Sequence, residues 1–280
     1  LVFVVGNYLT SSSHRLSAVL CYIFASLRWY GVFPCVPCLL GYDVGMRPYR
    51  YFNMVPVHRW NSLTCMLWFL LLVHAALFMT VTSPDRFWWY TNFALSWDGI
   101  SSGKFWQLLT YAFLHADWFH LIINLGMLWF VGERVFLILG RKKVFEIVVA
   151  GVMVGGVLHL FASMVAAVRG YSESYLVGVS GACFALLLAS IAISPHERVR
   201  FIPVSAKNLG LGIVIAEAMM LLMHPGLGLP VFSIMGDQLV LLGMGALFRV
   251  SHACHLGGAM AGWWMVRRVL APVATRHKQM

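Results

Sequence analysis

The sequence predicts an all-α, polytopic membrane protein built as a bundle of six transmembrane helices. Of its 280 residues, 60% are hydrophobic and only 11% are charged, and the mean hydropathy is +0.79. A soluble domain of this length carries about 25% charged residues, so too few polar side chains remain to cover a globule in water. Aromatic residues, including 11 Trp, are typical of the membrane–water interface. We therefore expect the lipid bilayer to be the solvent of this chain.

Six segments after residue 60 are apolar enough to form the helices of this bundle. A helix needs about 20 mostly apolar residues to cross a hydrocarbon core that is about 30 Å thick. The fourth and fifth segments are shorter than the others, so their ends should lie at or below the membrane surface. The expected helices are 64–82, 114–133, 144–168, 178–194, 208–223 and 251–270.

Basic residues in the connecting loops predict the orientation of the bundle. If the segment before the first helix is cytoplasmic, the inner loops hold 14 Lys and Arg residues and the outer loops hold 4. This asymmetry follows the positive-inside rule, so both ends of the bundle should face the cytoplasm. A bacterial inner membrane is the first expectation, and an organelle membrane satisfies the same rule. Because the charge of +10 is spread over short clusters, we expect no nucleic-acid partner.

Two of the outer loops are unusually apolar. The loop 83–113 contains the run Phe87-Trp88-Trp89-Tyr90 and is expected to lie in the membrane interface. The loop 224–250 contains an apolar run interrupted by Asp237 and several Gly, which favours a lid or an interfacial segment over a seventh span.

The first 45 residues are expected to be a dispensable extension of the domain 46–280. They contain an apolar stretch, but Arg28 lies within it, and Pro34 and Pro37 would break a helix there. All the candidate functional residues lie downstream of this extension.

No cofactor or metal ion is expected. Cys35 and Cys38 form a CxxC pair, but no second pair follows to complete a zinc site. His252 and His255 are one helical turn apart, yet the sequence places no carboxylate or suitable Cys beside them. His196-Glu197 lacks the HExxH spacing of a zinc protease.

Polar residues inside a membrane are energetically costly and often functional. The predicted topology brings five of them to one depth, in the outer halves of the second, fourth and sixth helices. His120 and Asn124 are four residues apart and share a helical face, whereas His115 points elsewhere. The five residues are His115, His120, Asn124, Ser180 and His255.

Small residues beside Ser180 and His255 indicate that their helices pack closely. His255, Gly258 and Gly262 share one face, and Gly181 and Ala185 form a second small-residue stripe. Contact between these faces would bring Ser180 within hydrogen-bonding reach of His255, which could accept its proton and make it a nucleophile. Nearby donors from His120 and Asn124 could stabilise an oxyanion.

These residues stand in three motifs that resemble those of the rhomboid family of intramembrane serine proteases. The segment Gly178-Val179-Ser180-Gly181 is similar to the family's GxSG motif, and the spacing of His115, His120 and Asn124 resembles its second-helix signature. Ala253-Cys254-His255-Leu256-Gly257-Gly258-x3-Gly262 resembles its sixth-helix signature. The resemblance covers about residues 46–270, and Trp106-Gln107 departs from the family's Trp-Arg pair.

The resemblance implies a serine endopeptidase with a Ser180–His255 dyad, assisted at the oxyanion by His120, Asn124 and the Ser180 backbone N–H. It implies cleavage of transmembrane protein substrates near their outer ends, and it says nothing of oligomeric state. Phe184 takes a position often held by Tyr and could stack on His255. Structural support is expected from His115, Gly178, Gly181, Phe184, Gly258 and Gly262.

Two other functions remain open from the sequence. A catalytically inactive rhomboid-like protein could bind membrane clients, although such a protein usually lacks the Ser or the His. A proton-coupled transporter could use the His cluster, but its polar groups should line the full depth of the bundle. His74 and His159 are expected only to bond a neighbouring carbonyl group.

Overall fold

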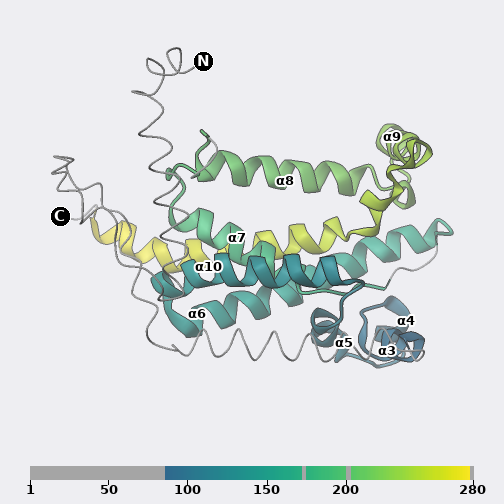
Figure 1. The fold of residues 1–280 in the computed structure, drawn as a ribbon, viewed down its shortest axis with the longest axis horizontal. Helices are drawn as coiled ribbons and strands as arrows, with labels where there is room; N and C mark the ends of the chain where they lie inside the picture. Colours follow the sequence, from purple (N-terminus) through teal and green to yellow (C-terminus); the bar gives the residue numbers. More distant parts are fainter. Residues whose placement is uncertain (1–85, 172–174, 200–202, 278–280) are drawn as a thin grey trace, which may run out of the picture. The chain divides into compact units, whose positions relative to one another are not determined.

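The computed structural model describes residues 86–171, 175–199 and 203–277, which all belong to the compact unit Asn61–Met280 (Figure 1). These ranges are mostly helical and form no strands beyond two isolated bridges, which confirms the all-α prediction. The expected first span, 64–82, and the extension 1–45 lie outside the described residues.

The first described helices are short and precede the long helices of the bundle. They are α3 (Arg86–Phe93), α4 (Trp97–Ser101), α5 (Gln107–Thr110) and the 3-10 turn η3 (Tyr111–Phe113). The bundle consists of α6 (Trp118–Val168), α7 (Ser180–Ile193), α8 (Ala206–Leu222) and α10 (His252–His277). Between α8 and α10 lie η4 (Pro225–Leu227), α9 (Pro230–Leu239), the π-helical turn η5 (Val240–Met244) and η6 (Gly245–Arg249).

The helix α6 is two helices joined at one glycine. Gly140 has φ 81° and ψ 168°, a conformation that only glycine adopts readily, and the helix reverses direction there (Figure 1). The arms 118–139 and 141–168 correspond to the expected spans 114–133 and 144–168. Asp117 begins the first arm by accepting a hydrogen bond from the His120 N–H at 2.8 Å.

The count of six spans is not confirmed by the described helices. Two of them are long and apolar enough to cross a membrane: α6 and the stretch Pro230–Arg249. The helices α7, α8 and α10 coincide with expected spans, but none of them is both long and apolar enough to cross a membrane. Pro230–Arg249 was expected to be a lid or interfacial segment; only 11% of its most apolar window is buried, and Gly243 interrupts its helical geometry.

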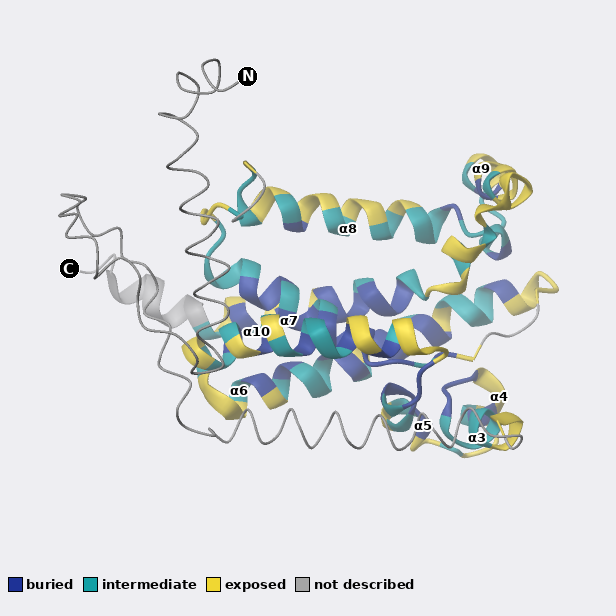
Figure 2. Ribbon diagram, viewed as in Figure 1, coloured by how far each residue is buried: buried dark blue, intermediate teal, exposed yellow. Residues whose placement is uncertain are grey.

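The helix α7 forms the centre of the bundle, between α6 and α10. These three helices pack on one another more extensively than any other pair of elements does. Nine of the 14 residues of α7 are buried, whereas Gly210 is the one buried residue of α8 (Figure 2). The residues of α7 are therefore positioned by two neighbours, and α8 is a peripheral helix.

Glycines bring the backbones of these three helices into direct contact. A Cβ at Gly258 or Gly262 of α10 would overlap the carbonyl oxygen of Gly181 or Ala185 of α7. A Cβ at Gly155 of α6 would lie 2.8 Å from the Cys254 carbonyl oxygen of α10. The two small-residue stripes predicted from the sequence therefore do face each other.

Four side chains hold the C-terminal end of α3. The Lys104 ammonium donates a hydrogen bond to the Thr91 carbonyl at 2.9 Å. The fully buried Gln107 amide donates to the same oxygen at 3.1 Å, and its own carbonyl oxygen accepts a hydrogen bond from the Ser96 N–H at 3.3 Å. Trp106 and Thr110 donate to the next two carbonyls, each at 2.8 Å. A cation at Lys104 also complements the helix dipole. Gln107, which stands where the resembled motif has Arg, thus helps to anchor this loop.

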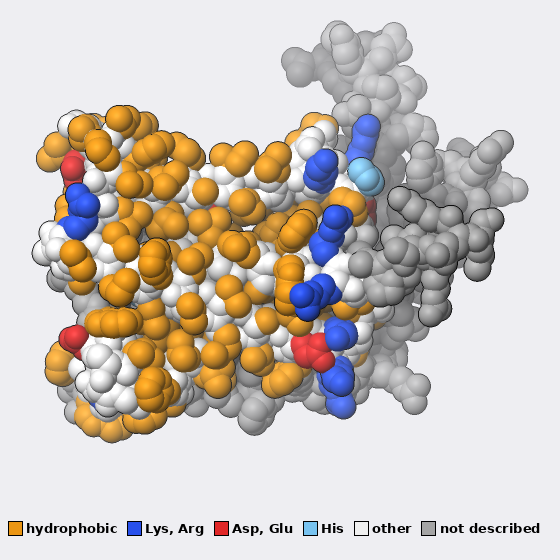
Figure 3. Space-filling model, turned by 180° about the vertical axis from the view of Figure 1, so that it is seen from behind, with side chains coloured by type: hydrophobic (Ala, Val, Ile, Leu, Met, Phe, Trp, Pro, Cys, Tyr) orange, Lys and Arg blue, Asp and Glu red, His pale blue; other side chains and the backbone are white. Residues whose placement is uncertain are grey.

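The surface of the bundle is suited to lipid. Figure 3 shows hydrophobic side chains over most of one face, with Lys and Arg gathered at one end. The Gly140 turn, the start of α8 and the end of α10 lie at that end (Figure 1). Its basic residues include Arg134, Arg141, Lys142, Lys143, Lys207, Arg267 and Arg268.

The glycine contacts predict the response of the fold to a single methyl group. Gly258→Ala should lower the free energy of unfolding by about 1–3 kcal/mol, because α10 must move away from the Gly181 carbonyl. Gly126→Ala is the matched control, since a Cβ at that helical position meets nothing within 4 Å. Thermal unfolding in detergent measures both variants, and equal midpoints would contradict the packing described here.

The hydrogen bonds at the C-terminal end of α3 predict a local effect of one substitution. Gln107→Ala leaves the buried Ser96 N–H without its acceptor and removes one of the hydrogen bonds to the Thr91 carbonyl. This loss should lower the free energy of unfolding by about 1–3 kcal/mol. Hydrogen exchange of residues 88–100 should accelerate in this variant and remain unchanged in Ser102→Ala, which alters an exposed residue of the same loop. Unchanged exchange in Gln107→Ala would show that Gln107 does not hold the loop.

Candidate active site

Ser180 is the first residue of α7, and its position depends on the segment before it. The Gly178 N–H donates to the Tyr111 carbonyl at 2.9 Å, and Leu176 exchanges two backbone hydrogen bonds with Leu95. The side chain of Ser180 is buried, with a relative exposure of 8%. The first N–H groups of a helix have no intrahelical acceptor, so Ser180 lies where backbone donors are available.

Gly178 leaves room for two polar side chains of α6. Its φ of 106° lies in the region that favours glycine. A Cβ there would lie 2.6 Å from Cε1 of His120 and 3.4 Å from Nδ2 of Asn124. The His120 and Asn124 side chains therefore lie against the backbone two residues before Ser180.

His115 contacts these side chains from a position before α6. It is fully buried, its Nε2 lies 3.1 Å from the Asn124 Nδ2, and its ring meets the His120 ring edge-on at 5.1 Å. The expectation that His115 lies in a helix beginning at residue 114 was wrong, because Asp117 caps α6 and Trp118 begins it. His115 can contact Asn124 because the backbone before the cap is extended rather than helical.

His255 lies in the first turn of α10 and packs on α7. Its ring stacks on the Phe184 ring with a centroid distance of 4.1 Å and an interplanar angle of 11°. The contact between Gly258 and Gly181 lies one turn further along α10. Ser180 and His255 therefore lie on facing parts of two helices in contact, although no hydrogen bond joins them among the described residues.

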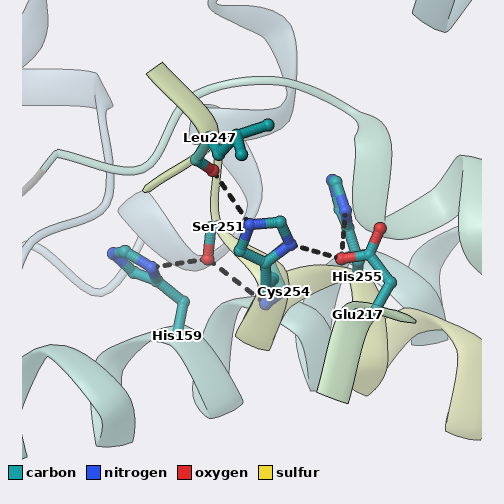
Figure 4. A network of polar contacts seen from close by, with 7 residues as sticks. His159, Glu217, Leu247, Ser251, Cys254 and His255 are labelled. Carbon is teal, nitrogen blue, oxygen red and sulfur yellow. Dashed lines mark hydrogen bonds and ion pairs between the residues drawn. The ribbon is translucent and has the colours of Figure 1, made fainter. Parts of the chain in front are cut away.

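Glu217 of α8 is a site residue that the sequence analysis did not single out. Its Oε2 lies 2.7 Å from the His252 Nδ1 and 3.1 Å from the His255 Nδ1 (Figure 4). The His252 Nε2 lies 2.9 Å from the Leu247 carbonyl oxygen. An acidic residue within the expected span 208–223 was a usable signal, since an intramembrane carboxylate needs a partner.

The same three residues revise the argument against a metal ion. That argument assumed that no carboxylate accompanies His252 and His255, but the structure brings Glu217 to both. One candidate ligand atom from each of the three residues lies within 4.8 Å of the others. Among the described residues, these are the side chains whose types and spacing could hold a divalent cation.

A second polar cluster fixes the start of α10. The His159 Nδ1 lies 2.8 Å from the Ser251 hydroxyl, which also accepts a hydrogen bond from the Cys254 N–H at 3.2 Å (Figure 4). The bond of His159 to Ser251 departs from the expectation that it only bonds a carbonyl. Ser251 caps α10 and His159 holds the cap, so this cluster orients the helix that carries His255.

Comparison with known proteins identifies the family of this chain. The family model described as "Rhomboid domain" matches residues 102–272. RHOMBOID-like protein 12, mitochondrial, from Arabidopsis thaliana is 30% identical over 158 residues, covering 52% of this chain and 47% of that protein. Rhomboid-like protein 16, chloroplastic, from the same organism is 25% identical over 165 residues, covering 52% of this chain and 51% of that protein.

The chain therefore spans about half the length of these two relatives. The matched region contains both arms of α6, α7, α8 and most of α10, and so includes every candidate site residue described above. By the extent of the family match, this integral membrane chain belongs to the rhomboid family.

Proposed function

We propose that this chain is an intramembrane serine endopeptidase in which Ser180 is the nucleophile and His255 is its base. One observation carries the proposal: the contact between α7 and α10 brings a buried Ser at a helix start to the helix face that bears a buried His. The His120 and Asn124 side chains, which lie against Gly178, add donors close in sequence to Ser180.

The proposed reaction follows from these groups. His255 accepts the Ser180 proton while Oγ attacks the scissile carbonyl, and the protonated His255 then donates to the leaving amine. The oxyanion is stabilised by His120, Asn124 and the Ser180 backbone N–H. Water, activated by His255, then hydrolyses the acyl-enzyme. The absence of a Ser180–His255 hydrogen bond in the free protein fits this scheme, since catalytic hydrogen bonds often tighten only when substrate binds.

The substrates proposed are transmembrane proteins that are cleaved near one membrane face. The start of α10 lies toward the end of the bundle opposite the basic Gly140 turn (Figure 1). If the basic end faces the cytoplasm or the equivalent organelle compartment, cleavage occurs near the opposite face. The names of the two relatives are mitochondrial and chloroplastic and do not favour a bacterial inner membrane. We therefore propose an organelle membrane as the location.

Ser180→Ala should abolish cleavage of a transmembrane substrate and labelling by a fluorophosphonate, because both need the Ser180 Oγ. Ser190→Ala is the matched control: Ser190 is a second Ser of α7 with the same exposure of 8%, and its variant should cleave and label normally. Cleavage by Ser180→Ala at the wild-type rate would exclude the mechanism. An unreactive wild type would instead favour an inactive relative that binds membrane clients.

His120→Ala and Asn124→Ala should each lower the cleavage rate clearly, by less than the roughly 10²–10³-fold loss seen when an oxyanion donor is removed from a soluble serine protease. The losses should be smaller because the Ser180 backbone N–H remains. Asn208→Ala makes the same change as Asn124→Ala on the exposed start of α8 and should have no effect. Normal rates in both single variants and the double variant would show that these residues only support the structure.

A further inference from the structure

The position of Glu217 calls for a chemical explanation. It is the one acidic residue of α8, a peripheral helix with a single buried residue, and its carboxylate reaches α10 (Figure 4). Burying a carboxylate among apolar side chains is costly unless hydrogen bonds and an opposite charge compensate it. The groups that Glu217 contacts on α10 are two imidazoles, and one of them is the proposed base.

The hydrogen bonds determine which protons these imidazoles carry. A carboxylate only accepts hydrogen bonds, so the His255 Nδ1, at 3.1 Å, carries a proton and donates a hydrogen bond to Glu217. In a neutral imidazole the other nitrogen, Nε2, then carries a lone pair and can accept a proton. This is the tautomer that a general base must have if it takes the Ser180 proton through Nε2.

His252 has acceptors at both ring nitrogens. Its Nδ1 is 2.7 Å from the Glu217 carboxylate, and its Nε2 is 2.9 Å from the Leu247 carbonyl oxygen. His252 therefore links the Glu217 carboxylate of α8 to the backbone just before α10. His255 shares the same carboxylate oxygen of Glu217.

We infer that Glu217 is a positioning residue for His255, so that the reaction runs through a Ser180–His255–Glu217 triad rather than a dyad. This inference rests on the proposed function. Glu217 fixes the ring orientation and tautomer of His255, as the Asp does in soluble serine proteases. When His255 takes the Ser180 proton, the carboxylate at its Nδ1 also stabilises the imidazolium that forms. Phe184 packs on the face of the His255 ring. Glu217 sets the rotation of the His255 ring within the plane of that ring.

The test compares Glu217→Gln with wild type in detergent or liposomes. Glutamine keeps the size of the side chain but loses the charge, and its amide N–H₂ can impose the wrong tautomer on His255. We expect kcat to fall by more than about tenfold, and by less than the roughly 10⁴-fold loss for the corresponding change in a soluble protease. KM should stay unchanged, fluorophosphonate labelling should slow in parallel, and Glu217→Asp should recover part of the rate.

The control is His252→Gln, which removes the other partner of Glu217. If Glu217 only ties α8 to α10 through His252, both variants lose the same thermal stability and neither loses kcat, which overturns the inference. Wild-type kcat in Glu217→Gln overturns it as well. Loss of activity in EDTA with recovery in Zn²⁺ also overturns it, because the three residues would then hold an ion. These outcomes require an active wild type, so they are distinct from a failure of the proposed function itself.

Discussion

The direct contact between the backbones of α6, α7 and α10 is the constraint on which the rest of the structure depends. Three helices approach this closely only where side chains are absent, and glycines on each of the three helices provide those positions. The approach places the first turn of α10 beside the first turn of α7, and the second arm of α6 against both. The placement of the α10 face that bears His255 against the start of α7 is therefore set by the packing of these helices.

Pairing of polar groups is the second requirement that the fold meets. An unpaired buried donor or acceptor costs about 1–3 kcal/mol, and the apolar surroundings supply no water to replace a lost partner. The Tyr111 hydroxyl donates to the Val152 carbonyl at 2.7 Å, and burial raises the pKa of Tyr111 well above its ordinary value, so it remains a donor. The bonds of His115 to Asn124 and of His159 to Ser251 serve the same purpose. The site residues are thus part of a wider network that also stabilises the bundle.

Features that depend on periodicity and hydropathy could be predicted from the sequence. Contacts that join distant segments of the chain could not. The helical class, the location of α7, α8 and α10 and the facing glycines could be predicted because each follows from local spacing. The bond of Glu217 to His255 joins residues 38 positions apart on different helices, and no periodic pattern encodes the rotation of α8 that aims the carboxylate at α10. The sequence alone could show Glu217 as an isolated charge in an apolar span, but not its partner.

The anchoring of the first loop illustrates the same limit. The departure at Gln107 was visible in the sequence, but the bonds that replace the usual Arg were not, because they depend on where α3 ends. Lys104, which the sequence analysis counted only as an outer-loop charge, lies at that end. In this chain the anchoring is divided among several side chains, and their spacing resembles no motif.

The single-residue turn at Gly140 has a consequence for how the chain enters a membrane. With no loop between its arms, α6 is a helical hairpin, and neither arm can be inserted while the other remains far from the bilayer. Arg134, Arg141, Lys142 and Lys143 surround the turn, and moving one such charge to the bilayer centre costs about 2.5–3.5 kcal/mol on insertion scales. The basic tip therefore opposes transfer across the bilayer, which favours insertion of the two arms as a pair.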